Sequence, residues 1–169
     1  MRKLLLAALA GAAIAAPVSA ETTTRDLEVI GRALSFVDGA SGSDRTVAIV
    51  YDAGSEAEAQ ALASSMSGGL SAGRVTLNGR LVSSSDLSGL SGADAAVLLG
   101  GTAGDAAVAS AANSAGAMSV STDMGCVQSG GCVMGVQSAP SVRIVVNRAN
   151  ASSASVSFAA AFAMMIEEI

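Results

Sequence analysis

Short polar residues follow three apolar runs of this chain, at the points where buried strands would end. Because the carboxyl ends of parallel strands meet at one edge of a sheet, such residues could together hold a small polar ligand. The same residue types also cap helix N-termini, and this structural role is the competing interpretation. The candidate ligand-binding residues are Asp52, Ser55, Gly101, Thr102, Ser121, Thr122 and Asp123.

Histidine is absent, and its absence argues against several kinds of site. Ser-His-Asp and Cys-His nucleophilic arrangements both need it. Two cysteines and a set of methionines are too few ligands for a zinc or copper site. Asp52, Asp123 and Arg143 remain as acid–base candidates, but no spacing brings them together. We therefore expect no enzyme, no metal and no cofactor.

Residues 1–20 have the pattern of a secretory signal peptide. A basic pair is followed by an apolar run at 4–16 and by a small-x-small cleavage pattern at 18–20. As a transmembrane anchor, the alternative, this run is too short to cross about 30 Å of hydrocarbon comfortably. We expect export to the periplasm, with no direct membrane insertion after cleavage.

The remaining 149 residues suit one domain, 21–169. Cleavage leaves seven basic residues, all arginine, against fourteen acidic ones, a net charge of −7. An acidic chain without basic clusters or aromatic platforms is a poor binder of nucleic acid and of anionic membranes.

Cys126 and Cys132 are separated by five residues that include Ser129-Gly130-Gly131, which favours a turn. Two cysteines in an exported protein most simply form one disulfide. Catalytic thiol pairs usually have the closer C-x-x-C spacing. We expect the disulfide to pin a surface loop, and a redox switch is the alternative role.

Apolar runs and helical patterns alternate along the chain. Each run has the composition of a strand buried on both faces, which is typical of parallel sheets with helices on each side. The alternation predicts an α/β fold: a three-layer single domain with a mostly parallel sheet flanked by helices and one local disulfide loop. The expected strands include 46–51, 95–99 and 117–121, and the expected helices include 24–37, 55–66, 105–115 and 159–168.

Two local signals add detail. Ser55-Glu56-Ala57-Glu58 has the S-x-x-E pattern of a capping box. Asn78-Gly79 lies between alternating residues and predicts a hairpin, with a single curving strand broken by a loop as the alternative. We expect the methionines of the last helix to fill the core.

The segment VSTDMGCVQSGGCVMGVQSAPSVRIVVNRANASSASVSFAAAFAMMIEEI resembles the C-terminal half of the YfiR-type periplasmic proteins. The resemblance lies in the order of its elements: a strand, a Gly-containing loop, two strands ending at Asn147, a small helix, an extended piece and a terminal helix. The helix containing 33–37 and the following TVAIVY also fit this order. Members often carry a disulfide near this loop, which Cys126 and Cys132 would match.

The resemblance implies a non-enzymatic periplasmic regulator. The best-known type restrains a membrane diguanylate cyclase, and so cyclic-di-GMP signalling, by binding its periplasmic portion. The implied partner is therefore an inner-membrane sensor or the periplasmic domain of a diguanylate cyclase, with a homodimer as a second form of association. The alternative function is a periplasmic small-molecule binding module that resembles one lobe of a transport substrate-binding protein.

Overall fold

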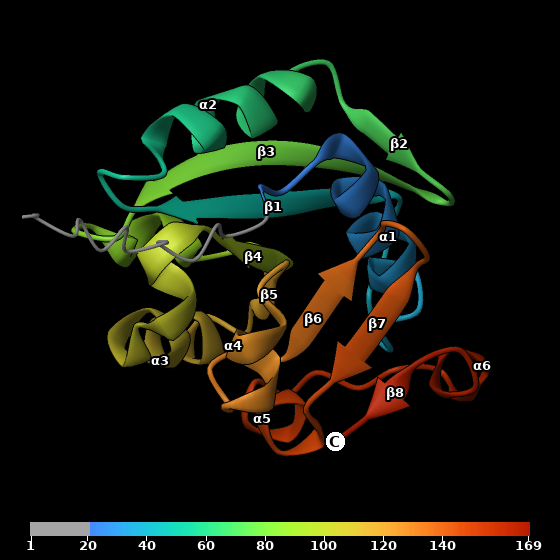
Figure 1. Ribbon diagram of the computed structural model, residues 1–169. Coiled ribbons are helices and arrows are strands. Elements are labelled where there is room, and N and C mark those ends of the chain that lie inside the picture. The colour runs from blue at the N-terminus through green and yellow to red at the C-terminus, as the bar shows by residue number, and fades with distance from the viewer. Residues whose placement is uncertain (1–20) are drawn as a thin grey trace, which may run out of the picture.

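An eight-stranded mixed sheet forms the centre of the protein (Figure 1). The computed structural model describes residues 21–169, so the predicted signal peptide at 1–20 lies outside the described residues. The strands are β1 (Asp44–Tyr51), β2 (Leu70–Ala72), β3 (Val75–Ser83), β4 (Ala95–Leu98), β5 (Met118–Ser121), β6 (Met134–Gln137), β7 (Arg143–Val146) and β8 (Glu167–Glu168).

The strand order is β2-β3-β1-β4-β5-β6-β7-β8. Strands β3, β1, β4, β5 and β6 run parallel to one another, whereas β2 pairs antiparallel with β3, and β7 antiparallel with β6. The helices are α1 (Thr24–Leu34), α2 (Glu56–Ser65), α3 (Ala106–Ser114), α4 (Met124–Gln128), α5 (Arg148–Ser153) and α6 (Ala160–Ala163), with short 3-10 segments η1 (Leu87–Leu90) and η2 (Gly100–Gly104).

Successive residues of the central strands face opposite cores. In β1, Val47 and Ile49 pack with α1 and α2, whereas Ala48 and Val50 pack with η1, α3 and α4. Both faces of the sheet are therefore covered by helices. This arrangement confirms the predicted three-layer α/β fold with a mostly parallel sheet.

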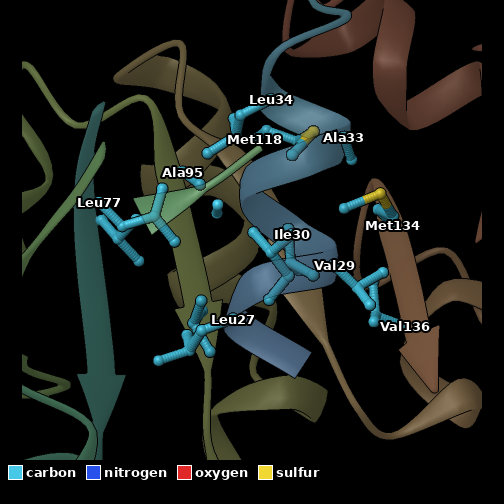
Figure 2. Close-up of a cluster of buried hydrophobic side chains, with 14 of the residues drawn as sticks. Leu27, Val29, Ile30, Ala33, Leu34, Leu77, Ala95, Met118, Met134 and Val136 are labelled. Carbon is cyan, nitrogen blue, oxygen red and sulfur yellow. The ribbon is translucent and has the colours of Figure 1, made fainter. Parts of the chain in front are cut away.

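Helix α1 packs tightly over one face of this sheet. Its start is fixed by a capping box between Thr23 and Asp26. Its buried side chains lie between Leu77 and Ala95 on one side and β6 on the other (Figure 2). At Gly31 an added Cβ would overlap the Cβ of Ala72, so glycine is what allows α1 to approach β2.

The predicted hairpin at Asn78-Gly79 is wrong, because both residues lie inside β3 and pair with β1. Glycine is needed at position 79 for packing: an added Cβ would lie 2.7 Å from the Cε atom of Met66, at the end of α2. The hairpin instead joins β2 to β3 through Gly73, whose φ of +70° suits glycine.

The predicted last helix at 159–168 is also wrong. Helix α6 spans only Ala160–Ala163, and the chain then extends as β8 beside β7 (Figure 1). Phe162 is buried, but Met164 and Met165 are 88% and 60% exposed, so these two do not fill the core. The extended conformation lets the backbone of β8 satisfy the open edge of β7, which a helix cannot do.

Candidate functional site

The carboxyl ends of β1, β4 and β5 lie at one edge of the sheet, and the seven candidate ligand-binding residues follow these strands. After β1 the chain returns to β3, on one side of β1, whereas after β4 it continues to β5, on the other side. The point between β1 and β4 is therefore a topological switch point, where open α/β sheets commonly bind ligands. We call this group of seven residues the strand-end site.

The carboxylate of Asp52 bridges the two loops at this switch point. Its Oδ1 atom accepts hydrogen bonds from Gly54 N (2.9 Å), Ser55 N (3.0 Å) and Ser55 Oγ (2.9 Å). Its Oδ2 atom accepts one from Gly101 N (3.0 Å), where an added Cβ would lie 2.8 Å from the same oxygen. These donors, the Ser55 hydroxyl first, hold the pKa of Asp52 below its usual value.

The predicted capping box of α2 does not form. Ser55 makes no side-chain cap bond to the helix, because its hydroxyl donates to Asp52 instead. Glu58 accepts a 2.7 Å hydrogen bond from Thr22 N. The S-x-x-E pattern predicted the start of α2 correctly. It could not show that the Ser55 hydroxyl would donate a hydrogen bond to Asp52, three residues earlier.

The other hydroxyls and the remaining carboxylate of the strand-end site also bond within the protein. Thr102 Oγ1 donates to the carbonyl of Leu99 (2.7 Å), and Ser121 Oγ to that of Leu98 (3.2 Å). Asp123 caps α4 by accepting from the backbone N–H of its second residue at 2.8 Å. These contacts match the helix-capping and loop-holding interpretation.

An N-terminal residue fills much of the crevice beside this site. Thr22 is buried, and its Oγ1 atom lies 3.2 Å from that of Thr122. The hollow left between Thr22, Glu58 and the end of β5 has a volume of about 50 Å³. Sites for small organic ligands usually measure several hundred Å³. In this conformation the crevice has no room for one.

The remaining acid–base candidate, Arg143, is held at 2.7 Å by Glu167 of β8. Within residues 21–169, no three acidic or cysteine side chains converge in a way that could hold a metal ion. The pairing of Arg143 follows from the end of the chain forming a strand, which the sequence pattern did not reveal.

Cys126 and Cys132 form the predicted disulfide, with Cα atoms 5.4 Å apart. The bond itself is buried, with Cys126 3% and Cys132 0% exposed, so only the intervening turn lies at the surface as expected. Asn150 Nδ2 donates to the carbonyls of Gly130 (2.7 Å) and Cys132 (2.9 Å), which ties the turn to α5. A disulfide is consistent with an oxidising compartment.

A hollow of about 570 Å³ lies between α3, the cysteine turn and α5. None of the candidate residues lines it. Two of its hydroxyls, those of Ser114 and Ser153, already donate to carbonyls of their own helices. The Oδ1 atom of Asn113, which also lines this hollow, has no hydrogen-bond partner within the described residues.

A second hollow of about 380 Å³ carries features that the sequence interpretation missed. We call it the arginine groove, because Arg32 and Arg74 line it among mainly apolar side chains. It is formed by the end of α1, the β2–β3 turn, β7 and the segment 162–165. Because these stretches are far apart in the sequence, no local spacing could have indicated it. Its lining residues are Val29, Arg32, Ala33, Ser35, Phe36, Gly73, Arg74, Val142, Ile144, Phe162 and Met165.

Comparison with known proteins supports the fold alone. No protein-family model and no curated protein matches the chain. The structure is similar to the crystal structure of a conserved domain protein from Vibrio cholerae O1 biovar El Tor strain N16961, with a TM-score of 0.58 and 15% sequence identity. The match covers 86% of this chain and 59% of that protein, so this chain spans about three fifths of its length. At this identity the similarity shows a shared fold and nothing more specific.

Proposed function

We propose that the protein is a periplasmic, non-enzymatic regulatory module that binds the periplasmic portion of an inner-membrane sensor or diguanylate cyclase. The observation that carries the proposal is the exposure of three large apolar side chains toward the β7–β8 end of the sheet, which we call the apolar patch: Val142 and Met165, which both line the arginine groove, and Met164, which precedes Met165. Val142, Met164 and Met165 are 55%, 88% and 60% exposed. Large apolar side chains gathered at a surface commonly mark a contact site for another protein.

Three further features support a contact function over ligand binding at the strand-end site. The carboxylates and hydroxyls of that site bond to neighbouring backbone, and its crevice is narrow. The order of elements from β5 to α5 is the order that the resemblance to YfiR-type proteins implies, whereas α6 and β8 stand where that resemblance implies a terminal helix. Among residues 21–169, none of the helices has the length and apolar character needed to cross a bilayer.

The proposal is tested by direct binding to the periplasmic domain of a membrane cyclase or sensor encoded beside this protein. Isothermal titration calorimetry compares the wild type with Met164→Glu and with Leu81→Glu. Leu81 is a matched control, because it is an exposed apolar residue (41%) on β3, away from the patch. We expect saturable binding that Met164→Glu weakens at least tenfold and Leu81→Glu leaves unchanged. No binding by the wild type, or equal effects of the two variants, would overturn the proposal.

A further inference from the structure

The floor of the arginine groove is built from aromatic rings that the fold holds together. The rings of Phe36 and Phe162 stack with centroids 5.3 Å apart, and Phe158 lies 5.0 Å from Phe162. Backbone pairing fixes this contact: Ala159 N donates to the carbonyl of Phe36 (2.8 Å), and Val37 forms a bridge with Phe158. The groove therefore has a preformed apolar floor, as small-molecule sites usually do.

Two guanidinium groups stand at this floor. Arg32 belongs to the last turn of α1, and Arg74 follows Gly73 in the β2–β3 turn. An added Cβ at Gly73 would lie 3.4 Å from the Cγ atom of Arg32, so the turn and the arginine stem are in close contact. Within residues 21–169, neither guanidinium has a hydrogen bond or an ion pair.

Most of the other arginines of the described chain have a partner. Three of them form ion pairs with acidic side chains, and Arg80 donates to the carbonyl of Ser91. Of the described arginines, Arg25 alone shares the unpaired state of the groove pair, and it does not line the groove. In a chain with fourteen acidic residues, two arginines without an acidic partner among the described residues therefore line one apolar hollow.

We propose that the arginine groove binds a small amphiphilic carboxylate, with the carboxylate held by Arg32 and Arg74 and an aliphatic body on the aromatic floor. Guanidinium forks match carboxylates geometrically, and about 380 Å³ lies within the usual size range of small-molecule sites. An anionic lipid surface offers the same chemistry, but the acidic net charge of the protein repels it. Val142 and Met165 belong both to the groove lining and to the proposed contact patch. The inference nevertheless goes beyond the partner contact, because it rests on the two arginines and the aromatic rings.

The first test is calorimetric titration with decanoate, octanoate and decanol. We expect decanoate to bind saturably at one site per chain. Octanoate should bind more weakly, by up to about fourfold for each methylene that the groove buries. Decanol, which lacks the charge, should bind at least about fivefold more weakly than decanoate. Equal binding of decanol and decanoate, or no saturable binding, would overturn the proposal.

The second test locates the site. Arg32→Gln and Arg74→Gln should each weaken decanoate binding about three- to tenfold, the range expected for partly exposed charge pairs. Arg25→Gln is the matched control, because Arg25 is also exposed and unpaired but lies about two turns before Arg32 on α1. The affinity of the Arg25→Gln variant for decanoate should equal that of the wild type. Equal effects of all three variants would reject the groove as the site.

A third arm separates a soluble ligand from a membrane surface. The protein is sedimented with vesicles of phosphatidylglycerol and phosphatidylcholine in equal parts. We expect no co-sedimentation, and arginine-dependent co-sedimentation without decanoate binding would overturn the assignment. Met164, used to test partner contact, does not line the groove, so failure of either proposal can be recognised separately.

Discussion

The strand-end site and the arginine groove differ in how much of their polar capacity the fold already uses. At the strand-end site, Asp52 accepts four hydrogen bonds from neighbouring residues, and buried hydroxyls donate to strand-end carbonyls. At the groove, Arg32 and Arg74 have no hydrogen bond or ion pair among the described residues. The strand-end site has the residue types of a binding site, whereas the arginine groove has charged groups that no other part of the described chain already binds.

This difference teaches that residue type and position at a strand end are weaker indications of binding than unsatisfied bonding capacity. A carboxylate whose acceptor sites are occupied must lose those bonds before it can bind a ligand. A guanidinium that faces solvent beside an apolar floor has to give up only its bound water when a ligand binds. Substitutions at the strand-end site should therefore lower stability, whereas substitutions of the two groove arginines and of the apolar patch should alter binding and leave stability almost unchanged.

The largest loss of stability should come from removing the disulfide that follows the strand-end site. The bond closes a short loop and is buried, so Cys126→Ala with Cys132→Ala should lower the free energy of unfolding by about 2 kcal/mol or more. Urea denaturation measures this loss. Decanoate affinity at the groove should not change in the folded variant. A loss below about 0.5 kcal/mol would show that neither the bond nor the packing of its sulfur atoms contributes much to stability.

Asp52→Ala should have the next largest effect, because it removes the link between the loops after β1 and β4. The loss of a capping carboxylate typically costs about 1–2 kcal/mol, measured here by urea denaturation. Asp86→Ala is the control, since Asp86 caps η1 through Ser88 alone and has no contact across the sheet. Its effect should be clearly smaller. Equal effects would mean that the bond to Gly101 contributes little.

The same carboxylate should make stability depend on pH. Because hydrogen bonds from Ser55 and its neighbours lower the pKa of Asp52 in the folded state, the folded state favours the ionised form. Its contribution is fully present above the unfolded value, about 3.9, and is lost as the pH falls through the lower folded value. Urea denaturation between pH 2 and pH 6 should show Asp52→Asn weakest relative to wild type above pH 5, with the difference shrinking in acid. A constant difference would contradict this assignment.

How far the sequence could predict each region follows from the range of the interactions involved. The β1–α2 and β4–α3 units were recognisable because runs such as TVAIVY and a capping Asp105 act through local chemistry. The prediction of a hairpin at Asn78-Gly79 was wrong because Gly79 is needed for close packing against Met66, which lies about a dozen positions earlier in the chain. A tight turn and close packing against a distant residue can both require glycine, so the residue type alone does not tell them apart.

The arginine groove could not be predicted for a related reason. It joins stretches from both ends of the chain, and it depends on residues after 163 extending as β8 instead of continuing a helix. The spacing of Phe162, Met165 and Ile166 suited a helix face, and only the open edge of β7 favours the extended form. The pattern thus identified Phe162 correctly as a packing residue but wrongly placed Met165, which is 60% exposed, in the core.

The smallest change in stability should come from the apolar patch, where Met164 is almost fully exposed. Met164→Ser should alter the free energy of unfolding by less than about 0.5 kcal/mol, because the side chain buries little surface in the folded chain. Leu81→Ser, the control on β3, should be equally neutral. The two variants should differ only in binding to the periplasmic domain of the membrane partner, measured by calorimetry. A marked loss of stability in Met164→Ser would mean that this methionine packs against the chain, and the patch would then lose its role as the contact surface.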